Sequence, residues 1–540
     1  MRTIQRKINN DKNQHVVRQR SIKYFLASAF AGLVAGLIAA LLAVVLMGIL
    51  RVVVGVPTPV ELFGDHVLKL LPAGQFVNLL IIFSPNSKTG PLGLTLLGMI
   101  ALGTVLGLLY AAIVHARLPL VGNRPTRRAW LVAGLVALVM TGIGIILFWG
   151  ELAQNYLGLP LEWARVVTAV GLLADFSLYG LTLCLTYYIL LPKQQVDDSS
   201  AVSRKRRQFL ARAGVAALGV GSAAGAVGVV KAYLNNYASY DGTETFPKHG
   251  FTAPITPNSE HYVVTQNAVD PVVNSGLWRL EVGGLVGQPG TYTYEEIQKL
   301  PSTSRAITLQ CIASGPGGRL ISTAIWQGVS LRTLLDKHGG AQTGARYIAF
   351  YSVDGYTVSL PLDEVLAVDP ILAWRMNGVE LPMRHGYPLR VLIPGRYGEE
   401  NPKWLTRVEL TDHLVGGLYA DQGWYNGPLH TITRIDRPTG HIPFSSSIQI
   451  GGIAFAGNRG IEKVEVSVDG GASWNTAKLD PPLSQDSWVL WTWEWKPLLP
   501  GGYTLVARST DGTGELQTSK KTGTVPGGGT GYHSVMVQVG

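Results

Sequence analysis

The pattern of apolar and polar residues divides the chain into two unlike parts. Up to about Lys231, long apolar runs alternate with short basic segments, and beyond it short runs are separated by glycine, proline and aspartate. Four runs reach the ~20 residues that a helix needs to cross a bilayer; they are Tyr24–Leu50, Pro91–Val114, Trp130–Trp149 and Val166–Leu191. A fifth run, Phe209–Val230, is richer in glycine and alanine. The pattern predicts a multi-pass α-helical membrane domain of four helices over residues 1–192, then a cytoplasmic linker and a fifth helix over residues 193–232.

A shorter run, Leu68–Phe83, contains Gln75 and Asn78. Because it is short and partly polar, we expect it to be interfacial or re-entrant.

Basic residues predict the orientation of these helices. They gather before the first run, between the second and third, and between the fourth and fifth. Lysine and arginine collect on the cytoplasmic side of a membrane. We therefore expect a multi-pass protein of the plasma membrane whose N-terminus lies inside and whose C-terminal part lies on the periplasmic or extracellular side. The net charge of +10 is then a topology signal, and no basic patch interleaved with aromatic residues indicates nucleic-acid binding.

The lead-in to the fifth run is Ser203–Ala211, with the sequence Ser-Arg-Lys-Arg-Arg-Gln-Phe-Leu-Ala. Paired arginines, a spacer, Phe-Leu and a weakly apolar stretch resemble a twin-arginine export signal, which moves proteins already folded around a cofactor. The alternative is an ordinary basic flank of a membrane helix. Since no convincing small-residue cleavage site follows, we expect this helix to remain as an anchor.

Asp175 lies well inside the fourth run. An intramembrane carboxylate is costly and is by default a candidate for function. The interpretation that we favour is an aspartate that faces the helix bundle and pairs with Ser177, Tyr179 or a neighbouring helix.

The remainder of the chain predicts two domains. Residues 250–420 mix strand-like runs with helical segments such as Tyr294–Leu300 and Leu331–Lys337, the second capped by Ser330, and predict an α+β domain. Residues 440–540 predict a β-sandwich. Its strand-like runs and one of its turns are Val464–Val468, Asp469–Gly471, Trp488–Trp495 and Tyr503–Arg508. We expect the tryptophans to be core and interface residues rather than a carbohydrate platform.

Cys311 is the leading candidate for chemistry. The chain has two cysteines. Cys184 lies in an apolar run, so a disulfide between such different surroundings is not expected, and no Cys-x-x-Cys pair exists. Cys311 ends a strand-like run and precedes a glycine-rich loop, which suits a thiolate ligand for a soft or high-valent metal. A buried cysteine acting as a small hydrophobe explains this segment equally well.

Several motifs occur in order around Cys311. They are Leu309–Cys311 with Gly317–Gly318, Ile325–Val329, Asp354–Pro361, Leu372–Pro382, His385–Arg390 and Asn401–Leu405. Together they resemble the sulfite oxidase family of molybdopterin enzymes, in its bacterial membrane-anchored form, over roughly residues 262–538. The resemblance implies a sulfite-oxidase-type molybdopterin domain over residues 250–420. It also implies an immunoglobulin-like dimerisation domain over residues 440–540, and with it a homodimer.

The resemblance also implies a Mo-molybdopterin cofactor and the residues around it. Cys311 would supply the protein thiolate to molybdenum and take part in catalysis. Tyr356 matches the active-site tyrosine, whose hydroxyl can donate to a metal oxo group or a substrate oxygen. The implied cofactor-binding residues are Tyr262, Gln266, Asn267, Cys311, Asp354, His385, Arg390, Asn401 and Lys403. Arginine and lysine suit the cofactor's phosphate, and Asp354 suits the pterin N–H groups.

One departure from the family concerns the substrate. Where animal sulfite oxidases have Arg-Asn-His, this chain has Gln266, Asn267 and Ala268. An arginine expected to hold an oxyanion is lost, and Arg319, which we take as a catalytic candidate, or Arg396 would have to compensate.

The leading functional interpretation is oxygen-atom transfer at Cys311-bound molybdenum, with the oxidation of sulfite to sulfate as the first candidate. The alternative within the family is reduction of an S-oxide such as methionine sulfoxide. The substrate would then be a small oxyanion or an S-oxide. Because no b5-type haem module is recognised, electrons would pass to or from a separate carrier, a cytochrome or a quinone. From another class of protein, the chain would be an anchored binding or adhesion module.

Overall fold

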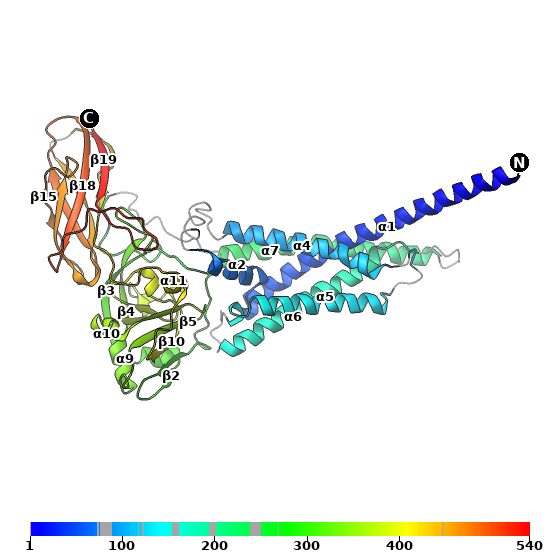
Figure 1. Ribbon diagram of the computed structural model, residues 1–540, viewed down its shortest axis with the longest axis horizontal. Coiled ribbons are helices and arrows are strands. Elements are labelled where there is room, and N and C mark those ends of the chain that lie inside the picture. Colours follow the sequence, from blue (N-terminus) through cyan, green and yellow to red (C-terminus); the bar gives the residue numbers. More distant parts are fainter. Residues whose placement is uncertain are drawn as a thin grey trace. The chain divides into compact units, whose positions relative to one another are not determined.

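The computed structural model describes residues 2–72, 75, 89–116, 118–120, 124–153, 161–193, 201–237, 250–267, 269–444 and 447–540. The chain forms two compact units (Figure 1). One is helical and is built mainly from residues before 239, and the other is rich in β-strands and is built mainly from residues 239–540.

The helical unit contains the expected long helices. Its helices are α1 (Arg2–Ile49), α2 (Pro59–Leu70), α4 (Thr89–Val114), α5 (Arg127–Leu147), α6 (Leu161–Leu190) and α7 (Ala201–Tyr237), with the turns η1 (Leu50–Val54) and η2 (Glu151–Ala153). The stretches long and apolar enough to cross a membrane are Ile22–Val54, Gly90–Val114, Arg127–Leu147, Trp163–Leu190 and Arg206–Ala232. Each contains one of the five predicted runs to within a few residues, so the helical prediction is confirmed. Most of Leu68–Phe83 lies outside the described residues.

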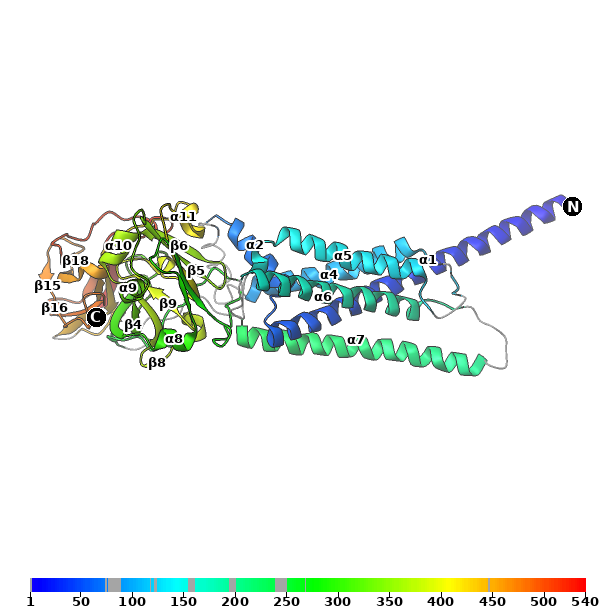
Figure 2. The ribbon, with the colours of Figure 1, turned by 90° about the horizontal axis from the view of Figure 1, so that it is seen from below.

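Small residues let the helices of this unit approach one another closely. Helix α1 packs against α4, α6 and α7 (Figures 1 and 2). A Cβ atom at Gly107 of α4 would lie 2.3 Å from the carbonyl oxygen of Gly32 and 2.7 Å from the Cα atom of Gly36 on α1. Gly32 and Gly36, like Gly103 and Gly107, are four residues apart, the spacing that brings helix backbones together.

Asp175 is 3% exposed on α6 and faces the bundle, as expected. The hydroxyl of Tyr179 donates instead to the carbonyl oxygen of Gly103, at 2.6 Å. Asp175 Oδ1 has no hydrogen-bond partner among the described residues. The expected pairing of Asp175 with Ser177, Tyr179 or a neighbouring helix stays a prediction.

Residues 250–420 form two sheets with short helices, which confirms the α+β prediction. The first sheet has the strand order β2-β1-β10-β5-β6, and the second has the order β3-β4-β7-β8 with β9 paired to β7. The strands are β1 (Leu280–Gly284), β2 (Gly290–Tyr292), β3 (Ser302–Gln310), β4 (Ile321–Ser330), β5 (Tyr347–Ser352), β6 (Thr357–Pro361), β7 (Ile371–Met376), β8 (Val379–Glu380), β9 (Arg390–Leu392) and β10 (Leu405–Thr411). The helices are α8 (Tyr294–Gln298), α9 (Leu331–Lys337), α10 (Leu362–Ala367) and α11 (Leu418–Asp421), with the 3₁₀ turns η3 (Met383–His385) and η4 (Gly398–Glu400).

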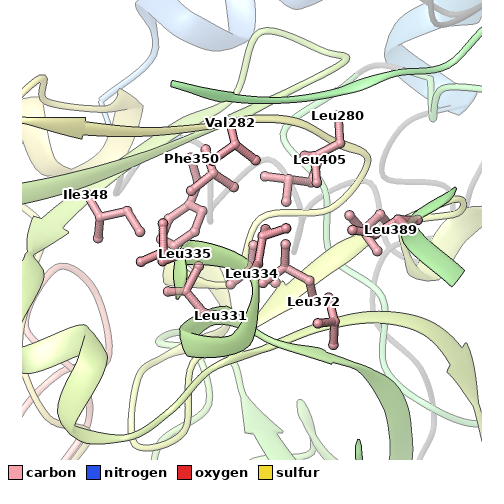
Figure 3. Close-up of a cluster of buried hydrophobic side chains, with 14 of the residues drawn as sticks. Leu280, Val282, Leu331, Leu334, Leu335, Ile348, Phe350, Leu372, Leu389 and Leu405 are labelled. Carbon is pink, nitrogen blue, oxygen red and sulfur yellow. The ribbon is translucent and has the colours of Figure 1, made fainter. Parts of the chain in front are cut away.

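The core of this domain lies between helix α9 and strands of both sheets (Figure 3). Helix α9 begins at the predicted cap, because the Ser330 side chain accepts a hydrogen bond from Thr333 N–H. Its buried residues Leu331, Leu334 and Leu335 recur with helical spacing. They pack with residues of the first and second sheets such as Phe350, Leu372 and Leu405. Burying each such side chain stabilises the fold by about 1.5–3 kcal/mol relative to exposure.

The C-terminal residues form two facing sheets around one core, as the predicted β-sandwich requires. One sheet has the order β11-β13-β17-β16 and the other the order β12-β19-β18-β14-β15. The elements are β11 (Ile432–Arg437), β12 (Gly440–Ile442), β13 (Ile448–Phe455), η5 (Gly457–Arg459), β14 (Ile461–Ser467), β15 (Asn475–Thr476), β16 (Lys478–Leu479), β17 (Val489–Trp495), β18 (Gly501–Asp511) and β19 (His533–Val539). Trp491 and Trp495 lie in the core between them, as expected. The immunoglobulin-like topology stays a prediction.

Candidate active site

Cys311 directly follows β3, in the loop that leads to β4. Its N–H donates to the carbonyl oxygen of Leu320 at 2.9 Å, and its own carbonyl accepts from the N–H of Ser314 at 2.9 Å. The side chain of Gln310 donates to the carbonyl oxygen of Ser314 at 2.7 Å. Because β3 and β4 are paired without a register shift, these bonds hold Cys311 in a fixed position at the end of the strand pair.

The C-terminal sandwich packs against the glycines of this loop. Arg434 Nη1 donates to the carbonyl oxygen of Gly318 at 3.1 Å. Gly317 has a φ angle of +82°, and a Cβ atom there would lie 2.4 Å from the ring of His533. A side chain at this position would therefore meet both an unfavourable backbone conformation and the ring. The glycine-rich sequence after Cys311 is explained by this close contact between the two domains.

Cys311 lines a cavity in the α+β domain. The cavity is partly open to solvent, and small-molecule and cofactor sites are typically concave in this way. The predicted residues that line it are Tyr262, Gln266, Cys311, Asp354, Tyr356, His385, Arg390, Asn401 and Lys403. The fold thus brings these residues together from segments far apart in the sequence. Their individual roles stay predictions.

Arg390 is a buried cation on the cavity wall. It is 4% exposed, and its guanidinium donates to the carbonyl oxygens of His385 at 3.0 Å and Asn401 at 3.3 Å. The guanidinium also lies 5.0 Å from the centre of the Trp326 ring. Arg390 Nε has no hydrogen-bond partner among the described residues. These contacts hold the guanidinium in one orientation and leave its Nε–H for a ligand.

Two further cations line the cavity. Lys403 Nζ lies 3.4 Å from the carbonyl oxygen of Val264 and 3.2 Å from that of Arg384, and 4.3 Å from the centre of the Trp404 ring. Arg384 itself forms an ion pair with Asp270, with Nε and Oδ2 3.0 Å apart. Lys403 is therefore held by neutral carbonyl groups against the wall of the cavity.

His385 is neutral in this setting. Burial lowers its pKa to about 3, and the positive charges of Arg390 and Lys403 lower the pKa as well. Its Nε2 lies 3.1 Å from the carbonyl oxygen of Asn258, so this nitrogen carries the hydrogen. The positive charge of the cavity wall therefore comes from arginine and lysine, while His385 contributes a neutral ring.

Asn267 positions Asp354 rather than lining the cavity. Its side-chain amide donates to Asp354 Oδ2 at 2.6 Å, and Asp354 Oδ1 accepts from the N–H of Tyr356 at 3.1 Å. Burial raises the pKa of Asp354, and the hydrogen bonds from Asn267 and Tyr356 oppose this rise. The hydroxyl of Tyr356 donates to the carbonyl oxygen of Glu399 at 2.5 Å, so this loop fixes the tyrosine ring.

Asn401, Gln266 and Tyr262 contribute to the wall in different ways. The Asn401 amide accepts from the N–H of Ile393 at 2.6 Å and donates to the carbonyl oxygen of Tyr397 at 2.7 Å. Its side chain is therefore occupied by the backbone. Gln266 Oε1 has no hydrogen-bond partner in the described part of the chain. Burial raises the pKa of Tyr262 well above its ordinary value, so its hydroxyl keeps its proton.

The two arginines named as replacements for the missing oxyanion ligand do not line the cavity. Arg319 is exposed and is absent from the lining. Arg396 is 7% exposed and forms ion pairs with Glu364 and Glu400. Whether Arg319 takes part in catalysis stays a prediction, and its side chain is not among those that the fold gathers around Cys311.

Other residues of the wall were not foreseen from the sequence. They are His261, Arg384, Glu399, Tyr419 and Trp424. His261 directly precedes Tyr262, and Glu399 lies two residues before Asn401, so proximity to a matched motif was the available signal for these two. Tyr419 and Trp424 lie beyond every matched motif, and only the folded chain brings them to the cavity.

Glu399 is the least expected of these residues. Both of its carboxyl oxygens are buried and lack a hydrogen-bond partner of good geometry among the described residues. Burial raises the pKa of Glu399 well above its ordinary value, the adjacent Glu400 adds to the rise, and the N–H groups of Glu399 and Ile312 oppose it. Since Ile312 follows Cys311 directly, this carboxyl lies beside the Cys311 loop.

The residues present fit a molybdopterin cofactor. Among the buried polar atoms of the wall that lack partners in the described residues are Arg390 Nε, Gln266 Oε1 and His261 Nε2, although buried polar groups are normally paired. Such a set suits a ligand with a phosphate and a polar ring system. No group of three or more metal-binding side chains occurs in the described ranges. A metal beside Cys311 would therefore take its other ligands from the cofactor.

Comparisons with known proteins agree with this fit. Residues 267–419 match the family described as the oxidoreductase molybdopterin binding domain. Residues 431–539 match the family described as the Mo-co oxidoreductase dimerisation domain. The first match covers the two sheets and the lining residues of the cavity from Leu309 to Tyr419, and the second covers the C-terminal sandwich.

The curated relatives include several nitrate reductases. Inducible nitrate reductase (NADH) 2 of Glycine max is 30% identical over 338 residues, which are 50% of this chain and 37% of that protein. Nitrate reductase (NADH) of Solanum lycopersicum is 27% identical over 337 residues, again 50% of this chain and 37% of that protein. The chain thus spans little more than a third of the length of these relatives.

Among solved structures, the sulfane dehydrogenase SoxCD from Paracoccus pantotrophus is similar, with a TM-score of 0.46 and 22% identity. This match covers 52% of the present chain and 77% of that one.

Proposed function

The chain belongs to the sulfite oxidase family of molybdopterin-dependent oxidoreductases, and from this we propose that it transfers an oxygen atom to or from a small substrate beside Cys311. The observation that carries the proposal is one cavity whose wall contains the Cys311 thiol, Tyr356 and the cations Arg390 and Lys403. When bound, the cofactor supplies a molybdenum centre that exchanges an oxygen atom and two electrons.

Each residue of the cavity has a defined task in this proposal. Cys311 donates a thiolate to the metal. Arg390 binds the cofactor's phosphate through its fixed guanidinium, and Lys403 adds a positive charge. Asp354, positioned by Asn267, accepts hydrogen bonds from the pterin ring. Tyr356 lies at the edge of the substrate space.

The charge around the cavity bears on the choice of substrate. Oxidation of sulfite requires a site for a doubly charged anion, and burying such a charge is costly without paired cations. Arg396 already pairs with Glu364 and Glu400, and the exposed Arg319 lies outside the lining. The buried carboxyl of Glu399 lies on the wall instead. These observations favour reduction of an uncharged S-oxide over sulfite oxidation, although nitrate reductases, by name, act on an oxyanion.

We place this site at a membrane. The five long apolar helices support an anchor in the plasma membrane, and the distribution of basic residues supports a catalytic part on the periplasmic or extracellular side. Electrons would pass through a separate carrier, a cytochrome or a quinone. The match to a dimerisation domain supports a homodimer.

The substitution Cys311→Ser tests the function. We expect the purified variant to fold but to lose oxygen-atom transfer below detection, because an alkoxide is a poor substitute for the thiolate. The measurements are molybdenum and pterin content and turnover of sulfite and of sulfoxides with artificial electron carriers. The control is Cys184→Ser in α6, which should keep wild-type turnover.

Near-normal turnover in Cys311→Ser would contradict the assignment. A fully matured wild-type sample without molybdenum would favour the anchored binding module instead.

A further inference from the structure

The C-terminal sandwich contacts the loop that carries the proposed metal ligand. This loop comprises residues 311–320 between β3 and β4, and we call it the cysteine loop. Arg434 on β11 donates to the carbonyl oxygen of Gly318 at 3.1 Å. The ring of His533 on β19 lies so close to Gly317 that it leaves no room for a Cβ atom there. The sandwich therefore touches the cysteine loop from two of its strands.

The guanidinium of Arg434 is held in one orientation. The residue is fully buried, and its Nε pairs with Asp436 Oδ1 at 2.6 Å. Its Nη2 donates to the hydroxyl of Thr252 at 2.9 Å, and that hydroxyl donates in turn to Asp436 Oδ2 at 2.5 Å. The three guanidinium nitrogens thus have three separate partners, and the third is the carbonyl oxygen of Gly318. A buried ion pair is weak evidence for stability and can instead select one arrangement of the chain.

The ring of His533 is neutral and has a fixed orientation as well. Burial and the positive charge of Arg434 lower its pKa to about 4, against the opposing effect of Asp436. Its Nδ1 accepts a hydrogen bond from the N–H of Ile435 at 2.9 Å, so the ring hydrogen is on Nε2. This bond holds the opposite edge of the ring against Gly317, whose φ angle of +82° suits glycine.

Hydrogen bonds within the cysteine loop connect these contacts to Cys311. The N–H of Gly318 donates to the carbonyl oxygen of Gly315 at 2.8 Å, and the N–H of Ser314 donates to the carbonyl oxygen of Cys311 at 2.9 Å. Two consecutive hydrogen-bonded turns therefore lie between the contact at Gly318 and the thiol. A shift of the glycines would move Cys311 with them.

The sandwich also holds the strand that leads to Cys311. Strand β3 is at the edge of the second sheet. The N–H of Thr308 donates to the carbonyl oxygen of Asp486 at 3.0 Å, and its hydroxyl accepts from the N–H of Trp488 at 2.8 Å. Asp486 and Trp488 lie between β16 and β17 of the sandwich. Strand β3 is thus bonded on both sides, to β4 and to the sandwich.

A loop of this composition needs outside support to present a ligand. Gly315, Gly317 and Gly318 give its backbone unusual conformational freedom. A functional side chain must be held within roughly 0.5 Å of its working position, and the groups that surround a metal ligand commonly orient it. The contacts from the sandwich supply such support at the glycines themselves.

We propose that Arg434 and His533 are positioning residues for Cys311. By fixing the glycines of the cysteine loop, they hold the thiol in the one position from which it can bind the cofactor's metal. The sandwich then has a task within a single chain, in addition to the dimerisation for which its family is named. This assignment rests on the proposed function, because it gives the loop a metal ligand to present.

The substitutions Arg434→Lys and His533→Asn test the assignment in the molybdenum-replete full chain. Lysine keeps a positive charge beside Asp436 but loses the planar fork that also reaches the cysteine loop. Asparagine keeps an acceptor for the N–H of Ile435 but places no ring against the loop. Both substitutions therefore spare the bonds within the sandwich more than those to the cysteine loop.

Two matched controls lie elsewhere in the sandwich. One is Arg508→Lys on β18, where the arginine pairs with Glu465 at 2.9 Å. The other is His441→Asn at an exposed position on β12. Both should behave as wild type in every measurement.

The first measurement is hydrogen–deuterium exchange of the amides in residues 311–320. We expect each variant to exchange the amides of Ser314 and Gly318 about threefold to tenfold faster, the change that corresponds to the loss of one hydrogen bond. Exchange does not require the metal, so it decides the matter even for a variant that retains none.

The second measurement is the electron paramagnetic resonance spectrum of the half-reduced molybdenum centre. Its g values should shift in both variants, because the thiolate would approach the metal at a different angle. For whichever substrate the wild type turns over, kcat should fall about tenfold while KM stays unchanged, since the two residues act on the ligand and not on the substrate.

Wild-type exchange and a wild-type spectrum in both variants would overturn the positioning role. A lower melting temperature without a change in exchange or spectrum would overturn it too, since the contact would then only join the two domains. If Cys311→Ser kept the wild-type spectrum and turnover, the proposed function itself would fail, whereas the exchange measurement would still report whether the sandwich holds the cysteine loop.

Discussion

At the scale of single residues, Arg390 shows most clearly how burial prepares the site for a ligand. Burial lowers its pKa to about 10, which still leaves it charged at neutral pH. Its partners are two neutral carbonyl groups and the Trp326 ring, and its Nε lacks a partner among the described residues. A buried cation without an anion is costly. An anionic ligand would offset that cost, and the cofactor's phosphate is such a ligand.

The substitution Arg390→Lys should therefore impair cofactor binding while keeping the charge. Lysine loses the rigid fork and the Nε donor, and losing hydrogen bonds to a charged group should weaken binding roughly 10- to 100-fold. The measurement is pterin and molybdenum content per chain after purification and dilution. Arg375→Lys, an exposed position on β7, is the control. Full cofactor retention by Arg390→Lys would contradict the phosphate assignment.

At the scale of secondary-structure elements, close backbone contacts decide what the helices and loops can tolerate. Gly107 of α4 faces Gly32 and Gly36 of α1 with no room for a Cβ atom. Gly98, on the same helix, has no heavy atom within 4 Å of an added Cβ atom. The two glycines therefore differ in their packing although both lie in one apolar run.

The substitution Gly107→Val should force α1 and α4 apart. Overpacking of this kind typically costs about 1–3 kcal/mol. We expect a lower melting temperature of the detergent-solubilised protein and a lower yield from membranes. Gly98→Val, which meets open space, should change neither. Equal stability of the two variants would show that the glycine contact does not hold the helix pair together.

At the scale of the whole molecule, the proposed orientation would require a cofactor-loaded domain to be exported across the cell membrane. The paired arginines Arg206 and Arg207 are exposed near the start of α7. If they belong to a twin-arginine signal, their identity matters and not only their charge, because a receptor reads such signals. If they are an ordinary basic flank, lysine serves equally well.

The double substitution Arg206→Lys with Arg207→Lys separates these possibilities. We expect it to leave the β-rich unit inside the cell and to abolish activity at the surface of spheroplasts. Protease accessibility of the β-rich unit provides a second measurement. Arg212→Lys, also exposed on α7, is the matched control. Unchanged external activity in the double variant would eliminate the export signal and leave the orientation rule intact.

The sequence by itself determined the long helices and the local elements around the site. The length of an apolar run predicts a membrane-type helix, and a capping residue such as Ser330 predicts the start of α9. Both signals come from residues that are close in the sequence. The resemblance also pointed to nine residues that the fold brings to one cavity wall. Asn267 is not among the lining residues and bonds through its amide to Asp354, so its role in cofactor binding stays a prediction.

Only the tertiary structure decided which charged side chains are available to a ligand and which backbone segments lie in close contact. Arg396 could have met a substrate, yet it pairs with Glu364 and Glu400. Trp424 and Glu399 both line the cavity that contains Cys311 although they belong to different segments. Gly107 could have been an ordinary helix residue, yet it touches α1. Burial and pairing depend on residues that are distant in the chain. A local sequence pattern therefore cannot predict which side chains are buried or paired.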